Sequence, residues 1–279
     1  MTDPAEFRAA SRKGWGAAAE GWEKWAPTTR DAFMPVTSWM LDAAGLQPGR
    51  RVLELACGTG EVGLLAHERI QPGGSLLLSD FAPEMLSAAQ RHAEQRGIAD
   101  ARFKQIDLAE PLDLEAGSQD VVLCRWGLMF VTDPESALRE IRRVLAADGT
   151  LSAATWAGAA ENPWSSVVER TLVALGHVEP AEGPGQFTLD DPDALAELLY
   201  SAGFTEVRVE PIAFTLDETF DQWWERTSGM SRAGQTIAAL SEEQRTEVVA
   251  ALLDALTSYE DADEVLHIPA TAIGIAASA

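Results

Sequence analysis

The chain has 279 residues and a formal net charge of −23, and it contains only three lysines. This composition disfavours nucleic acid and anionic membranes as partners, because phosphate groups are bound by clustered cations. No apolar run approaches the roughly 20 residues of a membrane-spanning helix, and the first ten residues lack the apolar core of a signal peptide. Two cysteines give no disulfide framework, which indicates a cytoplasmic location, and the spacing of the four histidines predicts no metal site.

The N-terminal part, residues 1–45, has a helical pattern and is rich in tryptophan. Trp15, Trp22 and Trp25 recur at spacings of seven and three, so we expect them to share one face of a helix. Such a face either packs against the body of the protein or closes over a bound ligand as a lid. The pattern alone leaves both interpretations open.

The stretch 51–63, RVLELACGTGEVG, predicts a buried strand, a tight turn and the start of a helix. The glycines of the turn have no Cβ atom, and the N–H groups at a helix start are unpaired, so a ligand can approach closely. Glu54 lies inside the strand, where a buried carboxylate is costly unless something pairs with it. We therefore expect Glu54 to serve a ligand.

A second acid follows the next apolar run. Asp80 ends the predicted strand 75–80, twenty residues after Gly60, where a carboxylate can accept hydrogen bonds from both hydroxyls of a ribose. A nucleoside with a cationic far end would use Asp80 and Glu54 together. S-adenosylmethionine (SAM), with its amino and sulfonium groups, is such a ligand.

From residue 50 to residue 156, predicted strands and helices alternate, which is typical of a doubly wound α/β sheet. The further strands expected are 101–106, 119–126, 150–156, 205–216 and 265–277. The further helices expected are 83–97, 134–145 and 191–203. We divide the chain into residues 1–45, 46–156 and 157–279, the last with a substrate-side connection (157–190) and a helical insertion (217–258). A connection of that length is usually functional.

The motif Glu54-x-Ala56-x-Gly58-x-Gly60 resembles the SAM-binding motif of class I SAM-dependent methyltransferases, with Ala56 where a first glycine is commonest. The stretch 138–151, LREIRRVLAADGTL, also resembles this family, in particular its ubiquinone/menaquinone-biosynthesis-like members. The resemblance implies a Rossmann-like, seven-stranded sheet, mostly parallel with an antiparallel last strand, plus an N-terminal helical lid and a helical insertion. It also implies SAM as cofactor and S-adenosylhomocysteine (SAH) as product.

The resemblance assigns cofactor residues as well. Asp107, the third acid to follow a strand, would hold the adenine amino group with help from the backbone of Leu108, and Met85 would lie against the adenine. The full set implied is Glu54, Ala56, Gly58, Thr59, Gly60, Asp80, Phe81, Met85, Asp107, Leu108, Arg125 and Trp126.

The residues expected around the methyl acceptor are aromatic and apolar, with few cations. They are Trp22, Trp25, Met129, Trp156 and Trp164. This inventory favours a small, largely apolar acceptor, such as a quinone precursor, a lipid precursor or a secondary metabolite. His177, in the long connection, is the one histidine placed to reach the site, and it is the candidate general base.

Two alternatives are weighed against this interpretation. Gly58-x-Gly60-x-x-Gly63 also matches the dinucleotide fingerprint of an NAD(P)-dependent oxidoreductase. That alternative does not explain Glu54, and neither tyrosine, Tyr200 or Tyr259, has a lysine four residues on. A non-catalytic or repurposed SAM-binding protein is the second alternative. The sequence leaves open the methylated atom and whether the chain forms a homodimer.

Overall fold

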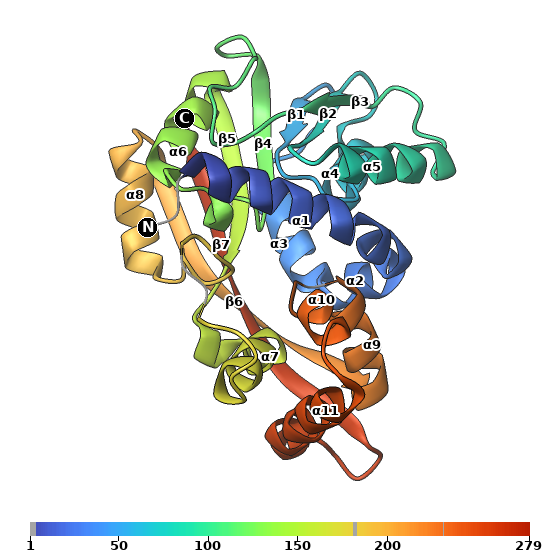
Figure 1. Ribbon diagram of the computed structural model, residues 1–279. Helices are drawn as coiled ribbons and strands as arrows, with labels where there is room; N and C mark the ends of the chain where they lie inside the picture. Colours follow the sequence, from blue (N-terminus) through green and yellow to red (C-terminus); the bar gives the residue numbers. More distant parts are fainter. Residues whose placement is uncertain (1–3, 181–182, 231) are drawn as a thin grey trace.

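The computed structural model describes residues 4–180, 183–230 and 232–279. Within them, seven strands form one sheet in the order β3-β2-β1-β4-β5-β7-β6 (Figure 1). The strands are β1 (Arg51–Glu54), β2 (Ser75–Asp80), β3 (Arg102–Gln105), β4 (Gln119–Arg125), β5 (Leu145–Trp156), β6 (Thr205–Thr219) and β7 (Val265–Ser278). Neighbours among β1 to β5 pair in parallel, and β7 runs antiparallel to both β5 and β6. This arrangement confirms the predicted fold class.

Helices cover both faces of the sheet. They are α1 (Pro4–Lys24), α2 (Ala26–Ala32), α3 (Met34–Ala43), α4 (Glu61–Ile70), α5 (Pro83–Gln95), α6 (Pro134–Val144), α7 (Pro163–Ala174), α8 (Pro192–Ser201), α9 (Phe220–Met230), α10 (Arg232–Ala238) and α11 (Glu242–Leu256). Side chains of α3, α4 and α5 share one buried cluster with the sheet, and those of α6 and α8 share another. In the described part of the chain, none of these helices is long and apolar enough to cross a membrane.

Successive residues of the parallel strands point to opposite faces, so β1, β2, β4 and β5 each contribute to both clusters. Val52 and Leu76 pack with α3, α4 and α5, whereas Leu53 and Leu77 pack on the side of α6 and α8. A sheet covered on both faces needs continuous apolar strands, which is why the predicted strands read as apolar runs rather than alternating ones.

The last two strands form a ribbon that extends beyond the rest of the sheet (Figure 1). β6 pairs with β7 from Thr205–Ser278 to Thr219–Val265, whereas β5 pairs with β7 only as far as Trp156–Ala272. The projecting part of the ribbon packs with α7, α9, α10 and α11 in a separate apolar cluster that includes Trp223. Because Trp156 is the last residue of β5, the projecting part lies beyond the carboxyl edge of the parallel strands, and it brings α9 against the end of α1, where Lys24 donates to Glu225.

Several element bounds differ from those predicted: β5 begins at Leu145 rather than at residue 150, and β6 extends to Thr219, three residues into the predicted helical insertion. Two further differences have a clear local cause. The connection 157–190 contains a regular helix, α7, because Pro163 occupies its first turn and Trp164, Val167, Val168 and Leu172 recur at helical spacing. The first strand ends at Glu54 rather than continuing to residue 56, because Ala56 has a positive φ of 50°.

Candidate active site

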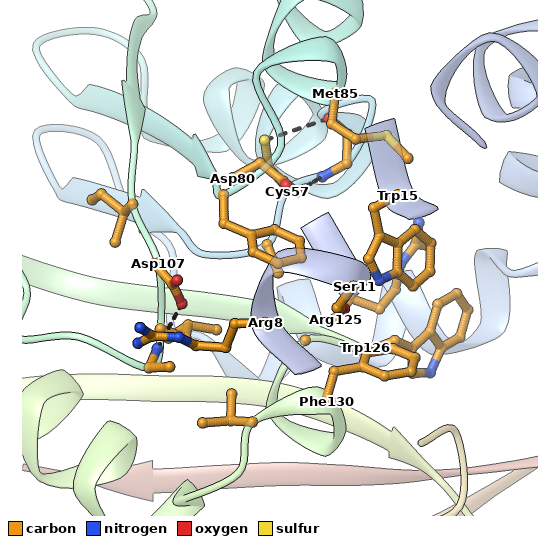
Figure 2. Close-up of a pocket in the computed structure, with 18 of the residues that line it drawn as sticks. Arg8, Ser11, Trp15, Cys57, Asp80, Met85, Asp107, Arg125, Trp126 and Phe130 are labelled. Carbon is orange, nitrogen blue, oxygen red and sulfur yellow. Dashed lines mark hydrogen bonds between the residues drawn. The ribbon is translucent and has the colours of Figure 1, made fainter. Parts of the chain in front are cut away.

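A cavity lies at the carboxyl ends of β1, β2 and β4, and α1 covers it. Every predicted cofactor residue except Gly60 lines this cavity. Figure 2 shows Arg8, Ser11 and Trp15 of α1 gathered around it with Asp80 and other side chains from the strand ends. The three acids at successive strand ends are therefore brought to one place, as their order along the chain predicts.

The turn after β1 is built from residues in the left-handed region. Ala56, Gly58 and Gly60 have φ values of 50°, 54° and 83°. The N–H of Gly60 donates to the carbonyl of Cys57 at 2.8 Å and closes the turn. Gly60 is the N-cap residue of α4, and a Cβ atom there would lie 3.1 Å from the Cβ of Ala89. Gly60 thus shapes the turn, although it lies outside the cavity lining.

Gly63 allows α4 to approach the sheet. Its N–H donates to Oε2 of Glu54 at 2.8 Å. A Cβ atom at this position would lie 2.4 Å from that oxygen and 2.4 Å from Cδ2 of Leu78. The third glycine of the dinucleotide-like pattern therefore serves the contact between helix and strand, so its presence carries no information about a nicotinamide ligand.

Glu54 is almost completely buried, at 2% exposure. Burial raises the pKa of its carboxyl group to about 8, against the opposing effects of the Arg125 guanidinium and the Gly63 N–H. The carboxyl group lines the cavity, so a cationic ligand group beside it would favour the charged form.

Asp80 is also buried, and both of its carboxylate oxygens accept hydrogen bonds from backbone N–H groups of the site. Oδ2 accepts from the N–H of Gly58 and Oδ1 from the N–H of Ala82, each at 2.9 Å. Burial raises the pKa of Asp80 to about 6, although these backbone donors act in the opposite direction. Each carboxylate oxygen has a second lone pair, so Asp80 retains capacity for two ligand hydroxyls.

The raised pKa of Glu54 predicts a pH-dependent stability of the unliganded protein. The folded state holds this proton more tightly than the unfolded chain, so the stabilisation is fully present below about pH 4.5 and is lost as the pH rises through about 8. We expect Glu54→Gln to remove this loss. The unfolding temperature of both proteins, measured between about pH 6 and pH 9, tests this expectation. Subtracting the two pH profiles isolates the contribution of Glu54 from those of the other titrating groups. If the unfolding temperatures of the wild type and Glu54→Gln changed with pH in the same way, the expectation would be contradicted.

The adenine end of the expected site is formed by the loop after β3. Oδ1 of Asp107 accepts from the N–H of Ala109 at 2.9 Å. Arg8 of α1 forms an ion pair with Glu110 in the same loop. Across the cavity, Met85 packs in a small apolar cluster to which α1 contributes Ala19 and two tryptophans. One face of α1 thus contacts both the β3 loop and the start of α5.

Ion pairs also join α1 to neighbouring helices. Arg91 of α5 donates to both carboxylate oxygens of Glu23, at 2.7 and 2.6 Å. Lys24 donates to Glu225 of α9 at 2.9 Å. Each exposed pair contributes little by itself, but together with the Arg8 pair they fasten α1 over the cavity at three points.

The end of β4 places a half-buried cation beside an aromatic ring. Nη1 of Arg125 donates to Oγ1 of Thr37 at 2.6 Å, and its guanidinium lies 4.6 Å from the ring centroid of Trp126. Trp126 has a positive φ of 60°, an uncommon conformation for a bulky residue. Its ring stacks on Trp156 with centroids 4.4 Å apart. Trp126 lines the cavity, and Trp156 lies behind it.

The predicted acceptor residues are divided between the cavity and its surroundings. Trp22 lines the cavity, whereas Trp25, Met129, Trp156 and Trp164 lie outside its lining. Met129 and Trp156 are 2% and 3% exposed and belong to the core. Trp25 follows the last residue of α1 and caps α2, so it leaves the face that Trp15 and Trp22 share.

His177, the candidate base, follows α7. Its backbone N–H donates to the carbonyl of Leu172, and it lies outside the cavity lining. Its Nε2 atom is buried and has no hydrogen-bond partner in the described parts of the chain.

Sequence reasoning missed several lining residues on α1 and after β4. They are Phe7, Arg8, Ser11, Phe130, Val131 and Thr132. On α1 a signal existed: residues 8, 11, 15 and 22 are separated by three, four and seven positions, so they continue the tryptophan face towards the N-terminus.

The side chain of Ala56 packs closely against Gly127, which leaves no room for a Cβ atom at position 127. A Cβ atom on Gly127 would lie 2.5 Å from the Cβ of Ala56 and 2.9 Å from Sγ of Cys124. We expect Gly127→Ala to destabilise the protein by about 1–3 kcal/mol through overpacking. Adding Ala56→Gly to this variant removes the contact with the Ala56 Cβ atom, and it also replaces an alanine of positive φ by a glycine. The double variant should therefore recover part of the lost stability. Denaturant unfolding of both single variants and the double variant tests this, and additive effects would contradict it.

Three features define a class I SAM-dependent methyltransferase. They are the order of the strands, the reversed last strand and the acid-lined cavity at the carboxyl edge of the sheet. A family model described as a methyltransferase domain matches residues 46–203. The chain belongs to this methyltransferase family.

Curated relatives carry methyltransferase names. The chain is 34% identical over 185 residues to a demethylmenaquinone methyltransferase of Thermus thermophilus, a match that covers 62% of this chain and 82% of that protein. It is 31% identical over 187 residues to nocamycin O-methyltransferase of Saccharothrix syringae, covering 63% of this chain and 66% of that protein. Among solved structures, the YcgJ protein of Bacillus subtilis is similar with a TM-score of 0.58 at 18% identity, covering 87% of this chain and 97% of that chain. The last similarity supports the fold alone.

Proposed function

We propose that this methyltransferase acts on a small, largely apolar acceptor, such as a quinone precursor, a lipid precursor or a secondary metabolite. One observation carries the proposal: between α1 and the end of β4 the cavity is lined by Trp15, Trp22, Trp126 and Phe130. Such a surface suits an apolar ring system. The names of the relatives, a demethylmenaquinone methyltransferase and nocamycin O-methyltransferase, agree with this class of acceptor.

The charges of the cavity support the same class. Two arginines line it, and each has a partner: Arg8 pairs with Glu110, and Arg125 contacts Thr37 and Trp126. A phosphate-rich acceptor or nucleic acid would require clustered unpaired cations. A cytoplasmic location belongs to the same proposal and is supported by the two unpaired cysteines, Cys57 and Cys124.

We assign the cofactor contacts by the chemistry of the cavity. Glu54 would receive the SAM amino group, Asp80 the ribose hydroxyls and Asp107 the adenine amino group. The residues fit this ligand, because two buried carboxyl groups with raised pKa values lie in one cavity and a cation would compensate them. Residues 46–156 would then form the SAM-binding core, and residues 1–45 would form the lid through α1.

SAM supplies an activated methyl group when it is bound. The chain aligns the acceptor with that group and excludes water from it, and alignment alone provides much of the rate acceleration in such a displacement. In the described residues no histidine lines the cavity. The proposal therefore needs no histidine base, and an acceptor that ionises readily, such as a phenol or hydroquinone, would react without one.

Methylation of a panel of acceptors tests the proposal. The panel contains 1,4-naphthohydroquinone, a simple phenol, phosphoethanolamine and transfer RNA, and SAH formation from SAM is the readout. We expect turnover with one or both aromatic compounds and none with the phosphorylated ones. Turnover confined to phosphoethanolamine or transfer RNA would contradict the acceptor class. Tight SAM binding without SAH formation from any compound would favour a repurposed SAM-binding protein.

A further inference from the structure

The guanidinium of Arg125 uses only part of its hydrogen-bonding capacity within the protein. Arg125 lines the cavity at the end of β4, and its Nη1 atom donates to Oγ1 of Thr37 at 2.6 Å. Among the residues that the structure describes, no other group accepts a hydrogen bond from this guanidinium. A guanidinium has several N–H donors and no acceptor. Its remaining donors can therefore bind an anionic ligand group in the cavity.

Thr37 is the fixed partner of this guanidinium. It belongs to α3, is 1% exposed and lies outside the cavity lining. Because Arg125 can only donate, the Thr37 hydroxyl must accept from it, and the hydroxyl proton is directed to the carbonyl of Phe33 at 3.2 Å. A β-branched side chain also has few rotamers in a helix. The buried hydroxyl therefore determines where the guanidinium lies.

The ring of Trp126 supports the same guanidinium from a second direction. The guanidinium carbon of Arg125 lies 4.6 Å from the ring centroid (Figure 2). The ring is held in turn by stacking on Trp156, with centroids 4.4 Å apart, and by edge-on contact with Phe33 at 4.7 Å. Phe33 thus contacts the ring and also accepts from the Thr37 hydroxyl. The start of α3 therefore positions both supports of Arg125.

The surroundings of Arg125 indicate which ligand group it binds. Arg125 and Glu54 both line the cavity, and the guanidinium favours the charged form of Glu54 by lowering the pKa of its carboxyl group against the effect of burial. Under the proposed function, Glu54 receives the amino group of SAM. The carboxylate of SAM is attached to the same carbon atom, so it must lie in this part of the cavity as well. The other cation of the lining, Arg8, is paired with Glu110 at the adenine end.

We propose that Thr37 is a positioning residue for the cofactor: its hydroxyl holds Arg125 in the orientation that binds the carboxylate of SAM. Thr37 acts only through Arg125. This inference rests on the proposed function and deepens it, because it makes the cavity selective for a nucleoside whose far end is an α-amino acid. It also gives α3 a part in cofactor recognition that is separate from the covering position of α1.

Variants of Thr37 test the proposal. Thr37→Val removes the hydroxyl and keeps the shape of the side chain, Thr37→Ala is a second variant without the hydroxyl, and Thr37→Ser retains it. Thr155→Val is the matched control, because Thr155 is also fully buried and its hydroxyl donates to the carbonyl of Leu189 outside the cavity lining. Circular dichroism and the unfolding midpoint establish that each variant is folded.

Two ligands differ only in the group that Arg125 would bind. SAH has the complete amino acid end, whereas decarboxylated SAH keeps the adenosine, the thioether and the amine but lacks the carboxylate. Calorimetric titration of both ligands into each variant gives the ratio of the two affinities. A loss of packing around Thr37 would weaken both ligands alike and leave this ratio unchanged, so the ratio separates a positioning role from a purely structural one.

The wild type should bind SAH at least about 10-fold more tightly than decarboxylated SAH, because a charge-assisted hydrogen bond is lost with the carboxylate. Thr37→Val should reduce this ratio by roughly 5- to 10-fold, whereas Thr37→Ser and Thr155→Val should keep it within about twofold. In an Arg125→Met background, Thr37→Val should have no further effect on the ratio.

Equal affinities of the wild type for the two ligands would overturn the inference, and so would an unchanged ratio in both Thr37→Val and Thr37→Ala. A change of the ratio by Thr37→Val that persisted in the Arg125→Met background would also overturn it, because Thr37 would then act by another route. Failure of the wild type to bind either ligand would instead contradict the proposed cofactor site.

Discussion

Asp80→Ala should weaken SAM binding by about 100-fold or more while the fold is retained. Two hydrogen bonds from ribose hydroxyls to a charged carboxylate are lost, each contributing about 1.5–3 kcal/mol. The variant also loses the acceptor that holds the N–H groups of Gly58 and Ala82. Calorimetric titration with SAM and SAH measures the effect.

Asp113→Ala is the matched control for Asp80→Ala. Asp113 pairs with Lys104 at 2.7 Å, and its side chain is 96% exposed. It lies outside the cavity lining, so its removal should leave SAM affinity unchanged. Equal affinities in the wild type and Asp80→Ala would reject the assignment of Asp80 to the ribose.

Gly63→Ala should destabilise the fold by about 3 kcal/mol, the upper end of the usual range for overpacking. The added Cβ atom would lie 2.4 Å from both Oε2 of Glu54 and Cδ2 of Leu78, so α4 must move away from β1 and β2. This loss exceeds the gain of about 1 kcal/mol that alanine brings over glycine within a helix. Urea unfolding gives the change in the free energy of unfolding.

Gly185→Ala provides a control for Gly63→Ala, because a Cβ atom at Gly185 would meet no heavy atom within 4 Å. Its stability should lie within about 0.5 kcal/mol of the wild type, as for most surface substitutions. If Gly63→Ala were as stable as this control, the close approach of α4 to the sheet would be contradicted.

The sheet was predictable from the sequence because its strands are buried on both faces. Continuous apolar runs such as 75–80 allow few alternatives, and the glycine turn after β1 marks where a strand changes to a helix. The reversed last strand was known only through the family resemblance. Neither the length of the β6–β7 ribbon nor its packing against α7 follows from local patterns, because both depend on contacts between distant segments.

The acids of the site were predictable for a related reason. In a parallel sheet the carboxyl ends of neighbouring strands meet at one edge, so Glu54, Asp80 and Asp107 reach the same cavity. The tryptophans were less predictable. Trp126 follows β4 and Trp156 ends the adjacent β5, yet the first lines the cavity and the second is buried behind it. Trp25 continues the spacing of Trp22, but α1 ends at Lys24, so the shared face ends there as well.

One measurement tests the central claim most directly: parallel calorimetric titrations of the purified protein with SAM, SAH and NADH. The buried carboxyl groups of Glu54 and Asp80 beside the glycine turn predict binding of SAM and SAH and no binding of NADH. Binding of NADH, with no heat from SAM or SAH, would contradict the account of this cavity.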